Sequence, residues 1–186
     1  MRGYLFALAG GVLIASIAAV SKLFKHLVMP AVNVINAVPI ASFTILALMA
    51  MDSSQLPVFV AFVTVMPIVF YNTLKGIEST DPALLQMASV FNVPWWKKAL
   101  YIYFKTVAPY VVSAATVGIG FAWKSGIAAE LIGIVRGTIG ASLHTARIHL
   151  STSDLFAWTI TIVLLSYCME RLFRLIFRKV MKWQSN

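Results

Sequence analysis

The sequence has few of the residues on which enzymes, metal sites and disulfide frameworks depend. Its 186 residues include one cysteine, three histidines and six acidic side chains. Cys168 alone cannot form an intrachain disulfide or a cysteine-based metal site. His144 and His149 are five residues apart, whereas two zinc-binding histidines on one helix face are usually about four apart. We therefore predict no catalytic site and no metal site.

The sequence also lacks a nucleotide-binding loop and a surface suited to nucleic acid. It contains no glycine-rich segment followed by Lys-Ser or Lys-Thr, so the chain is not expected to bind ATP by itself. The formal charge is +9, but the basic residues stand at the ends of apolar runs and do not alternate with aromatic residues. We expect no nucleic-acid partner and no cofactor in this chain.

Apolar residues dominate what is present. They make up 60% of the chain and charged residues only 11%, whereas a soluble domain is about half apolar and a quarter charged. A helix needs about 20 apolar residues to cross a hydrocarbon core, and five runs come close to that length. They are residues 4–20, 30–51, 57–73, 106–121 and 155–169. We therefore predict an all-α membrane protein with about five transmembrane helices, forming a single domain over residues 1–186.

Two segments interrupt this apolar pattern. Residues 75–105 hold six charged side chains and include Ser79-Thr80-Asp81-Pro82, which is typical of a helix start. We expect short helices there, outside the bilayer. Residues 123–153 mix charged residues with glycine and apolar residues, and they are expected to form either a re-entrant or a surface helix.

The distribution of positive charge gives the predicted spans a direction. Cytoplasmic loops of membrane proteins are enriched in Lys and Arg. With five spans and an external N-terminus, 11 of the basic residues fall on the cytoplasmic side and four on the external side. The sequence thus predicts an external N-terminus, a cytoplasmic C-terminus and a cytoplasmic position for residues 75–105.

The predicted cytoplasmic segment resembles a loop of the permeases of binding-protein-dependent ABC importers. In that loop a helix with a Glu-Ala-Ala core precedes a glycine, an aromatic-basic step and a proline that enters the next span. In this sequence those places are taken by Gln86-Met87-Ala88, Asn92, Trp96-Lys97-Lys98 and Pro109. Asn is the best non-glycine residue for a left-handed turn, so Asn92 is expected to keep the geometry of the glycine.

The resemblance covers nearly the whole chain. Residues 30–39 are similar to the segment after the family's first core span, and residues 118–130 and 154–158 resemble the branch that contains nitrate, sulfonate, taurine and thiamine-precursor permeases. Members often carry an additional N-terminal span, and the chain is similar to their five-helix core, the type I permease fold. Whether a native N-terminal span is missing stays open.

The resemblance implies a transport subunit in a bacterial cell membrane, and not an enzyme. Such a subunit lies in membrane lipid, pairs with a second copy or a paralogue, and receives substrate from an external binding protein. Two cytoplasmic ATPase subunits bind ATP and magnesium. The alternatives are a membrane coupling subunit of a vitamin-type (energy-coupling factor) importer and a membrane scaffold without transport. The transported substrate and the choice between homodimer and heterodimer are not predicted.

The predicted cytoplasmic helix provides a first set of candidate functional residues. A short amphipathic helix can dock its apolar side chains in a groove on an ATPase, and the spacing of Leu84, Leu85, Ala88 and Phe91 predicts one apolar face. The full ATPase-coupling set is Leu84, Leu85, Gln86, Ala88, Phe91, Asn92 and Trp96. The alternative is a helix that lies on the membrane surface with Trp95 and Trp96 as anchors, and the two interpretations can coexist.

Polar residues within the predicted spans provide a second set. They are functional candidates because an unpaired polar group in hydrocarbon is costly, although hydrogen bonds between helices are an alternative reason for them. The translocation-path set is Asn33, Asn36, Ser42, Asn72, Thr73 and Glu130. Glu130 lies close to Lys124 in the sequence, and we expect the two to form an ion pair or a gate.

Overall fold

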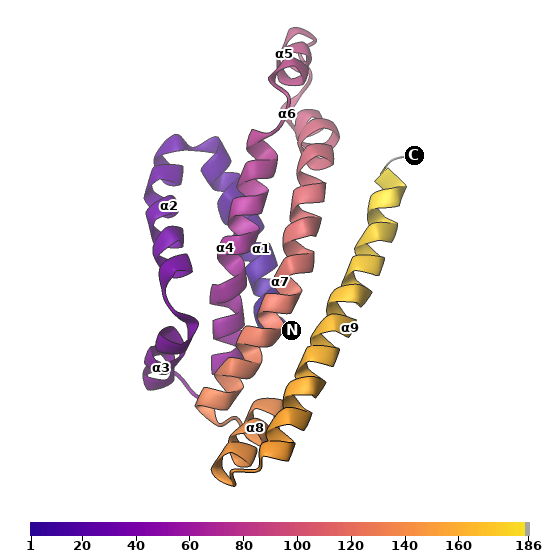
Figure 1. The fold of residues 1–186 in the computed structure, drawn as a ribbon. Coiled ribbons are helices and arrows are strands. Elements are labelled where there is room, and N and C mark those ends of the chain that lie inside the picture. Colours follow the sequence, from indigo (N-terminus) through magenta and orange to yellow (C-terminus); the bar gives the residue numbers. More distant parts are fainter. Residues whose placement is uncertain (185–186) are drawn as a thin grey trace.

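A computed structural model describes the backbone of residues 1–184 and the side chains of residues 1–175, and the described chain is a bundle of helices (Figure 1). The elements are α1 (Arg2–Val20), α2 (Lys22–Ala37), α3 (Ile40–Ala50), α4 (Leu56–Glu78), α5 (Pro82–Val90), α6 (Trp95–Lys98), a single π-helical turn η1 (Ala99–Tyr103), α7 (Phe104–Gly133), α8 (Ile139–Ile148) and α9 (Thr152–Gln184). The side chains of Arg178, Lys179 and Lys182, which contribute to the predicted charge split, lie outside the described residues.

The prediction of about five spans is confirmed for the described residues. Four helical segments are long and apolar enough to cross a membrane, namely α1, α4, the continuous run Trp95–Gly133 and the Thr152–Leu175 part of α9. The fifth is the pair α2 and α3, which is bent by 102°. Pro39 explains the bend, because it lacks an N–H and holds Val38 in an extended conformation with ψ 128°. The predicted run 30–51 is therefore a broken span, and its first helix begins at Lys22.

The expectation of short helices over residues 75–105 is confirmed for α5, whereas the helical runs on either side of α5 extend further into this segment than expected. Helix α4 continues through Lys75 to Glu78, and a single helical run extends from Trp95 through Lys105 to Gly133. Lysine favours helix, so a charged residue marks where a helix leaves hydrocarbon and not where it ends. For the same reason residues 123–133 remain in α7, and only α8 is a short helix of the kind expected within residues 123–153.

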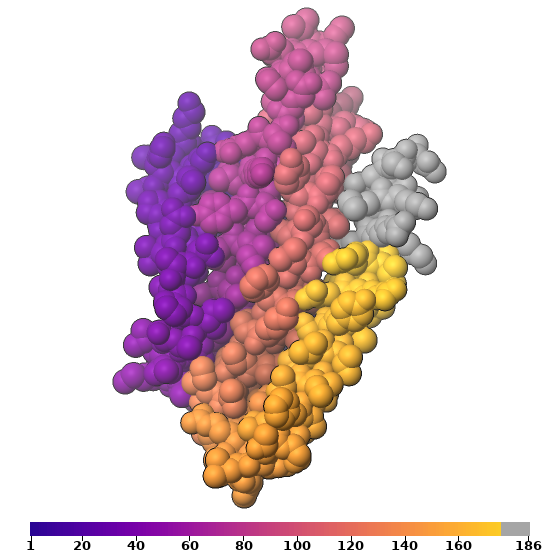
Figure 2. All heavy atoms as spheres, viewed as in Figure 1, coloured from indigo at the N-terminus to yellow at the C-terminus, as the bar shows by residue number. Residues whose placement is uncertain are grey.

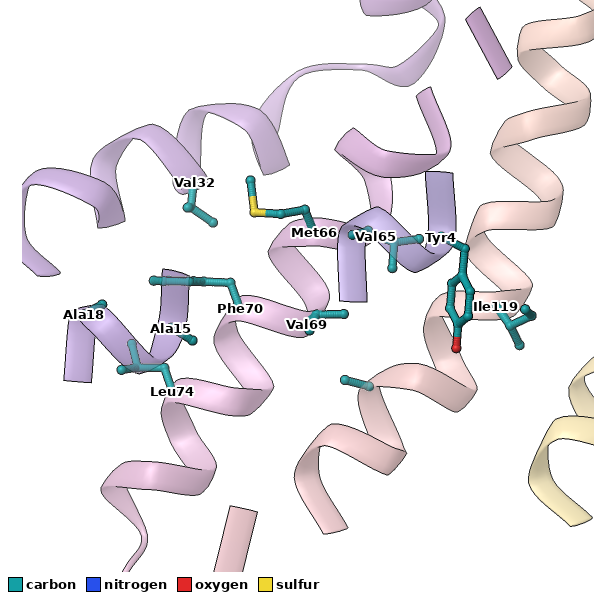
Figure 3. Close-up of a cluster of buried hydrophobic side chains, with 12 residues drawn as sticks. Tyr4, Ala15, Ala18, Val32, Val65, Met66, Val69, Phe70, Leu74 and Ile119 are labelled. Atoms are coloured by element: carbon teal, nitrogen blue, oxygen red, sulfur yellow. The ribbon is translucent and has the colours of Figure 1, made fainter. Parts of the chain in front are cut away.

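The core lies where α4 packs between α1 and α7. Figure 3 shows its buried side chains, which include Tyr4 and Ala15 of α1, Val65 and Phe70 of α4, and Ile119 of α7. Glycines bring the helices close together, as is usual where lipid provides no hydrophobic drive. A Cβ atom on Gly11, for example, would lie 2.8 Å from Cβ of Val69. Three tightly packed helices thus form the centre of the bundle.

The remaining long elements lie at the edges of this centre. The bent pair α2 and α3 flanks one side, and α9 runs along the other side against α7 (Figure 2). Only 6% of the apolar window of α9 is buried within the chain, compared with 50% for α4. The open sides of the outer helices are available to lipid and to other subunits.

Candidate functional site

Helix α5 projects beyond the rest of the bundle, at the end toward which α9 runs (Figure 1). The predicted helix start is confirmed: α5 begins at Pro82, and Oδ1 of Asp81 accepts a 2.8 Å hydrogen bond from the backbone N–H of Ala83. Asn92 ends the helix in the predicted left-handed conformation, with φ 49°. The N–H of Val93 donates to the carbonyl of Ala88 at 2.9 Å, which is the long hydrogen bond of a Schellman motif. Sequence-encoded caps therefore define both ends of α5.

The predicted coupling residues differ in how accessible they are. Phe91 is 74% exposed and Leu84 43%, whereas Ala88 is only 4% exposed and Leu85 is half-buried. Gln86, Asn92 and Trp96 are exposed. Ala88 therefore packs within this chain, although the spacing placed it on the same apolar face as Phe91.

Exposed apolar side chains gather at the tip of the projection. We name this set the tip surface, and its members are Leu84, Met87, Val90, Phe91 and Trp95. Sequence reasoning missed Met87 and Val90, because the predicted face was drawn through Leu84, Leu85, Ala88 and Phe91. The absence of charged residues between Pro82 and Phe91 was the available signal. An uncharged, apolar tip outside the bundle is suited to contact with a protein or a membrane surface.

The base of the projection is tied to the bundle by polar and close contacts. Lys25 of α2 forms an ion pair with Glu78 at the end of α4, 53 residues away. A Cβ atom on Gly76 would lie 3.1 Å from the side chain of Tyr110 in α7. Three helices are thus joined at the point where α5 departs.

The predicted path residues are spread over several environments. Asn33 accepts a hydrogen bond from the hydroxyl of Tyr71, and Nδ2 of Asn72 donates at 2.8 Å to the carbonyl of Ile68 in its own helix. Thr73 is 1% exposed, and Ser42 is exposed on α3. These four residues come from α2, α3 and α4.

Asn36 is the predicted path residue that borders a cavity beside the bent helix pair. This cavity has a volume of about 330 Å³ and lies on the side of α2 and α3 that faces α4. Phe43 of α3, Pro67 of α4 and Phe121 of α7 also line it. The bend at Pro39 thus lies beside this cavity, which Val38 and Ile40 also line.

Glu130 joins α7 to α8. Its Oε2 accepts a 3.2 Å hydrogen bond from the backbone N–H of Gly140 in the first turn of α8. The predicted ion pair with Lys124 is wrong, because Nζ of Lys124 lies 3.5 Å from Oε1 of Glu170 in α9. Six residues correspond to about 600° of helix rotation, so positions 124 and 130 point to different sides of α7.

Polar groups near Glu130 do not form a metal-binding cluster. Glu130, Thr138 and Trp123 border a second cavity of about 320 Å³ between α1, α4, α7 and α8. Among the described side chains, no three His, Cys, Asp or Glu residues are grouped so that they could hold a metal ion. The features that stand out are thus the tip surface, the cavity at the bent helix pair and the ion pair between α7 and α9.

Comparison with known proteins agrees with this architecture. Residues 11–182 match the family described as binding-protein-dependent transport system inner membrane component. The fold resembles a chain in the crystal structure of an amino acid ABC transporter with histidines, with a TM-score of 0.69 and 18% identity over 97% of this chain and 88% of that chain.

Two curated relatives show how much of a longer permease the chain matches. It is 25% identical to the putative aliphatic sulfonates transport permease protein of Bacillus subtilis, over 99% of this chain and 67% of the relative. It is 28% identical to the nitrate import permease protein of Synechococcus elongatus, over 70% of this chain and 47% of the relative. The chain thus spans about two thirds of the first relative, and the matched part of the second is about half of its length.

The family match covers the central helices, α5 and most of α9, and it favours binding-protein-dependent import over the two alternatives, a vitamin-type coupling subunit and a scaffold. A transport subunit, and not an enzyme, is therefore confirmed. The chain belongs to the family of inner membrane permease components of binding-protein-dependent ABC transport systems.

Proposed function

We propose that this chain forms one half of a translocation path and couples it to ATP hydrolysis in partner subunits. A second permease copy or a paralogue supplies the other half, because the long helices of one chain pack against each other and leave their outer faces open. Two ATPase subunits bind on the cytoplasmic side, and an external binding protein delivers the substrate. Two relatives are named for sulfonate and nitrate, both anions, which supports an anion as the transported substrate.

The observation that carries this proposal is the tip surface on α5. A projecting helix with exposed apolar side chains can seat in a groove of a soluble ATPase, and the main bundle then follows the motion of that subunit. The ion pair between Lys25 and Glu78 supports such coupling, because it links the base of the projection to α2.

The proposed orientation places the N-terminus outside and the tip surface in the cytoplasm. Helix α9 runs toward the end of the bundle where α5 projects (Figure 1), and Arg171 and Arg174 lie in its second half. Lys97, Lys98 and Lys105 lie at the same end. Positive charge on the side of α5 favours a cytoplasmic location.

Replacement of Phe91 tests the coupling role. Because this side chain is 74% exposed, Phe91→Asp should leave membrane insertion and thermal stability unchanged. We expect it to abolish co-purification of the ATPase with the tagged chain, while Phe91→Leu, which keeps the site apolar, retains the ATPase. Ala88→Asp is a poorer test, because Ala88 is 4% exposed and the new carboxylate would disturb the chain itself.

Two results would overturn the proposal. The first is a tagged wild-type chain that brings down no ATPase from its native membrane. The second is a Phe91→Asp variant that retains both the ATPase and substrate-stimulated ATP hydrolysis. In either case the tip surface would have to serve another contact, such as the membrane surface.

A further inference from the structure

Two opposite charges meet where the candidate spans Trp95–Gly133 and Thr152–Leu175 pack against each other. Nζ of Lys124 in α7 lies 3.5 Å from Oε1 of Glu170 in α9. Lys124 is nine residues from the end of α7 at Gly133 and 19 residues from Lys105, which is about 14 Å and about 28 Å along the helix axis. Charges within a membrane span are costly in hydrocarbon and face protein or water. The pair therefore needs an explanation beyond helix packing.

Gly120 of α7 leaves room for the carboxylate of Glu170 against the helix backbone. A Cβ atom on Gly120 would lie 2.0 Å from Oε1 of Glu170 and 2.9 Å from its Cδ. The carboxylate thus rests directly against the backbone of α7, where any larger residue would displace it. The Glu170 side chain is 32% exposed, whereas that of Lys124 is 63% exposed. Glu170 is seated between the helices, and Lys124 is presented at the surface.

Lys124 belongs to an open strip on α7. The strip consists of Ser113, Val117, Phe121 and Lys124, which are spaced by four, four and three residues and are all exposed. Such spacing places them on one side of the helix. Figure 2 shows α7 uncovered between α4 and α9 along this side of the bundle.

The open strip leads to the cavity at the bent helix pair. Phe121, one turn before Lys124, lines this cavity together with Asn36 and Phe43. The strip and the cavity are thus neighbouring features of the same side of the chain. This side combines polar groups, a charge and a hollow.

The side of the chain that carries Lys124 is unsuited to contact with lipid. A lysine can extend its charge toward the membrane surface when it lies near a helix end, but the nearer end of α7 is about 14 Å away from Lys124. We infer that Lys124 and Glu170 line a water-filled translocation path, in which Lys124 attracts anions and Glu170 positions it. This inference rests on the proposed function, since a second permease subunit must close the path.

The chain is well suited to a cysteine-labelling test. Its one cysteine, Cys168, is removed by Cys168→Ser, and Phe121→Cys then places a thiol on the open strip. Ala114→Cys is the matched control on the same helix, because Ala114 is 1% exposed and packs in the core. The probes are two membrane-impermeant methanethiosulfonates, an anionic sulfonatoethyl reagent and a cationic trimethylammonium-ethyl reagent, applied to membranes that contain the full chain.

We expect both reagents to label Phe121→Cys and neither to label Ala114→Cys. Dividing the labelling rate of the anionic reagent by that of the cationic reagent cancels differences in thiol reactivity. This rate ratio therefore reports the local charge. In a low-dielectric cleft one fixed charge changes such rates by about tenfold. Lys124→Gln should thus lower the ratio by about tenfold and Lys124→Arg should keep it. Glu170→Gln should raise the ratio.

Two outcomes would overturn the inference. An unreactive Phe121→Cys would show that the open strip faces lipid or a packed interface. A reactive Phe121→Cys whose rate ratio is unchanged by both Lys124→Gln and Glu170→Gln would remove the electrostatic role. If Lys124→Gln lowers the yield of folded chain, the Glu170→Gln measurement decides by itself. Neither outcome depends on ATPase co-purification, so this inference and the proposed function can fail separately.

Discussion

Gly10 and Gly11 are neighbours on α1 that meet different surroundings, and they provide a matched test of helix packing. A methyl group on Gly11 would lie 2.8 Å from both Cβ and Cγ1 of Val69 and 3.2 Å from the carbonyl oxygen of Met66. A methyl group on Gly10 would meet only Cε2 of Phe62, at 3.6 Å. Carbon atoms pack best at about 3.5–4.0 Å. Gly11→Ala therefore forces α1 and α4 apart by about 0.7 Å, and Gly10→Ala does not.

The energetic difference follows from this geometry. Overpacking of a tight contact costs about 1–3 kcal/mol, and both substitutions gain up to about 1 kcal/mol in helix propensity. The propensity gain cancels between the variants, so Gly11→Ala should be less stable than Gly10→Ala by about 1–3 kcal/mol. For a chain of this size, this difference corresponds to about 2–12 °C in Tm.

Thermal unfolding of the purified chain in detergent measures this difference. Gly10→Ala should melt at the wild-type temperature or above it, and Gly11→Ala below it. Equal melting temperatures for the two variants would refute the close contact between α1 and α4 at Gly11. A Gly10→Ala variant with the lower Tm would show that α1 is rotated from the described packing.

Three further predictions concern the connections between helices. Asn92→Gly should keep the wild-type Tm, whereas Asn92→Val should lower it because a β-branched residue at φ 49° adds about 1–3 kcal/mol of strain; equal Tm values would contradict the left-handed cap. Lys25→Glu should lower the Tm, with a loss of stability below about 1 kcal/mol because the pair is partly exposed. The double variant Lys25→Glu with Glu78→Lys should restore the Tm, and failure to do so would argue against the ion pair. Gly140→Ala should lower the Tm, because the added Cβ would lie 2.4 Å from a side-chain carbon of α7. Gly126→Ala should leave the Tm unchanged, because no atom lies within 4 Å of its added Cβ. Equal melting temperatures for the two variants would contradict the packing of α8.

Local signals in the sequence predicted local structure well. The Asp81-Pro82 start and the Asn92 end of α5 are confirmed because each depends on residues within one or two helical turns. Four of the apolar runs lie in helices that are long and apolar enough to cross a membrane, and the fifth, residues 30–51, lies in the bent pair α2 and α3.

Contacts between residues far apart in the sequence could not be predicted from the sequence patterns. Lys124 and Glu170 are 46 positions apart, and their contact depends on how α9 crosses α7, which hydropathy does not encode. The burial of Ala88 likewise depends on the packing of α5 within this chain and not on the spacing of apolar residues. Helix lengths were underestimated because charge was taken to end a helix, although Lys105 and Lys124 both lie within the run Trp95–Gly133.

That run has a mechanical consequence. Its 39 residues form one continuous helical run of about 58 Å, which includes the π-helical turn η1 and Pro109, starts at Trp95 of the tip surface and ends beside α8. The geometry is that of a lever arm: a tilt of about 5° at one end displaces the other end by about 5 Å, close to the pitch of one helical turn. A small rotation imposed at Trp95 would therefore be carried along this continuous helical run to Gly133.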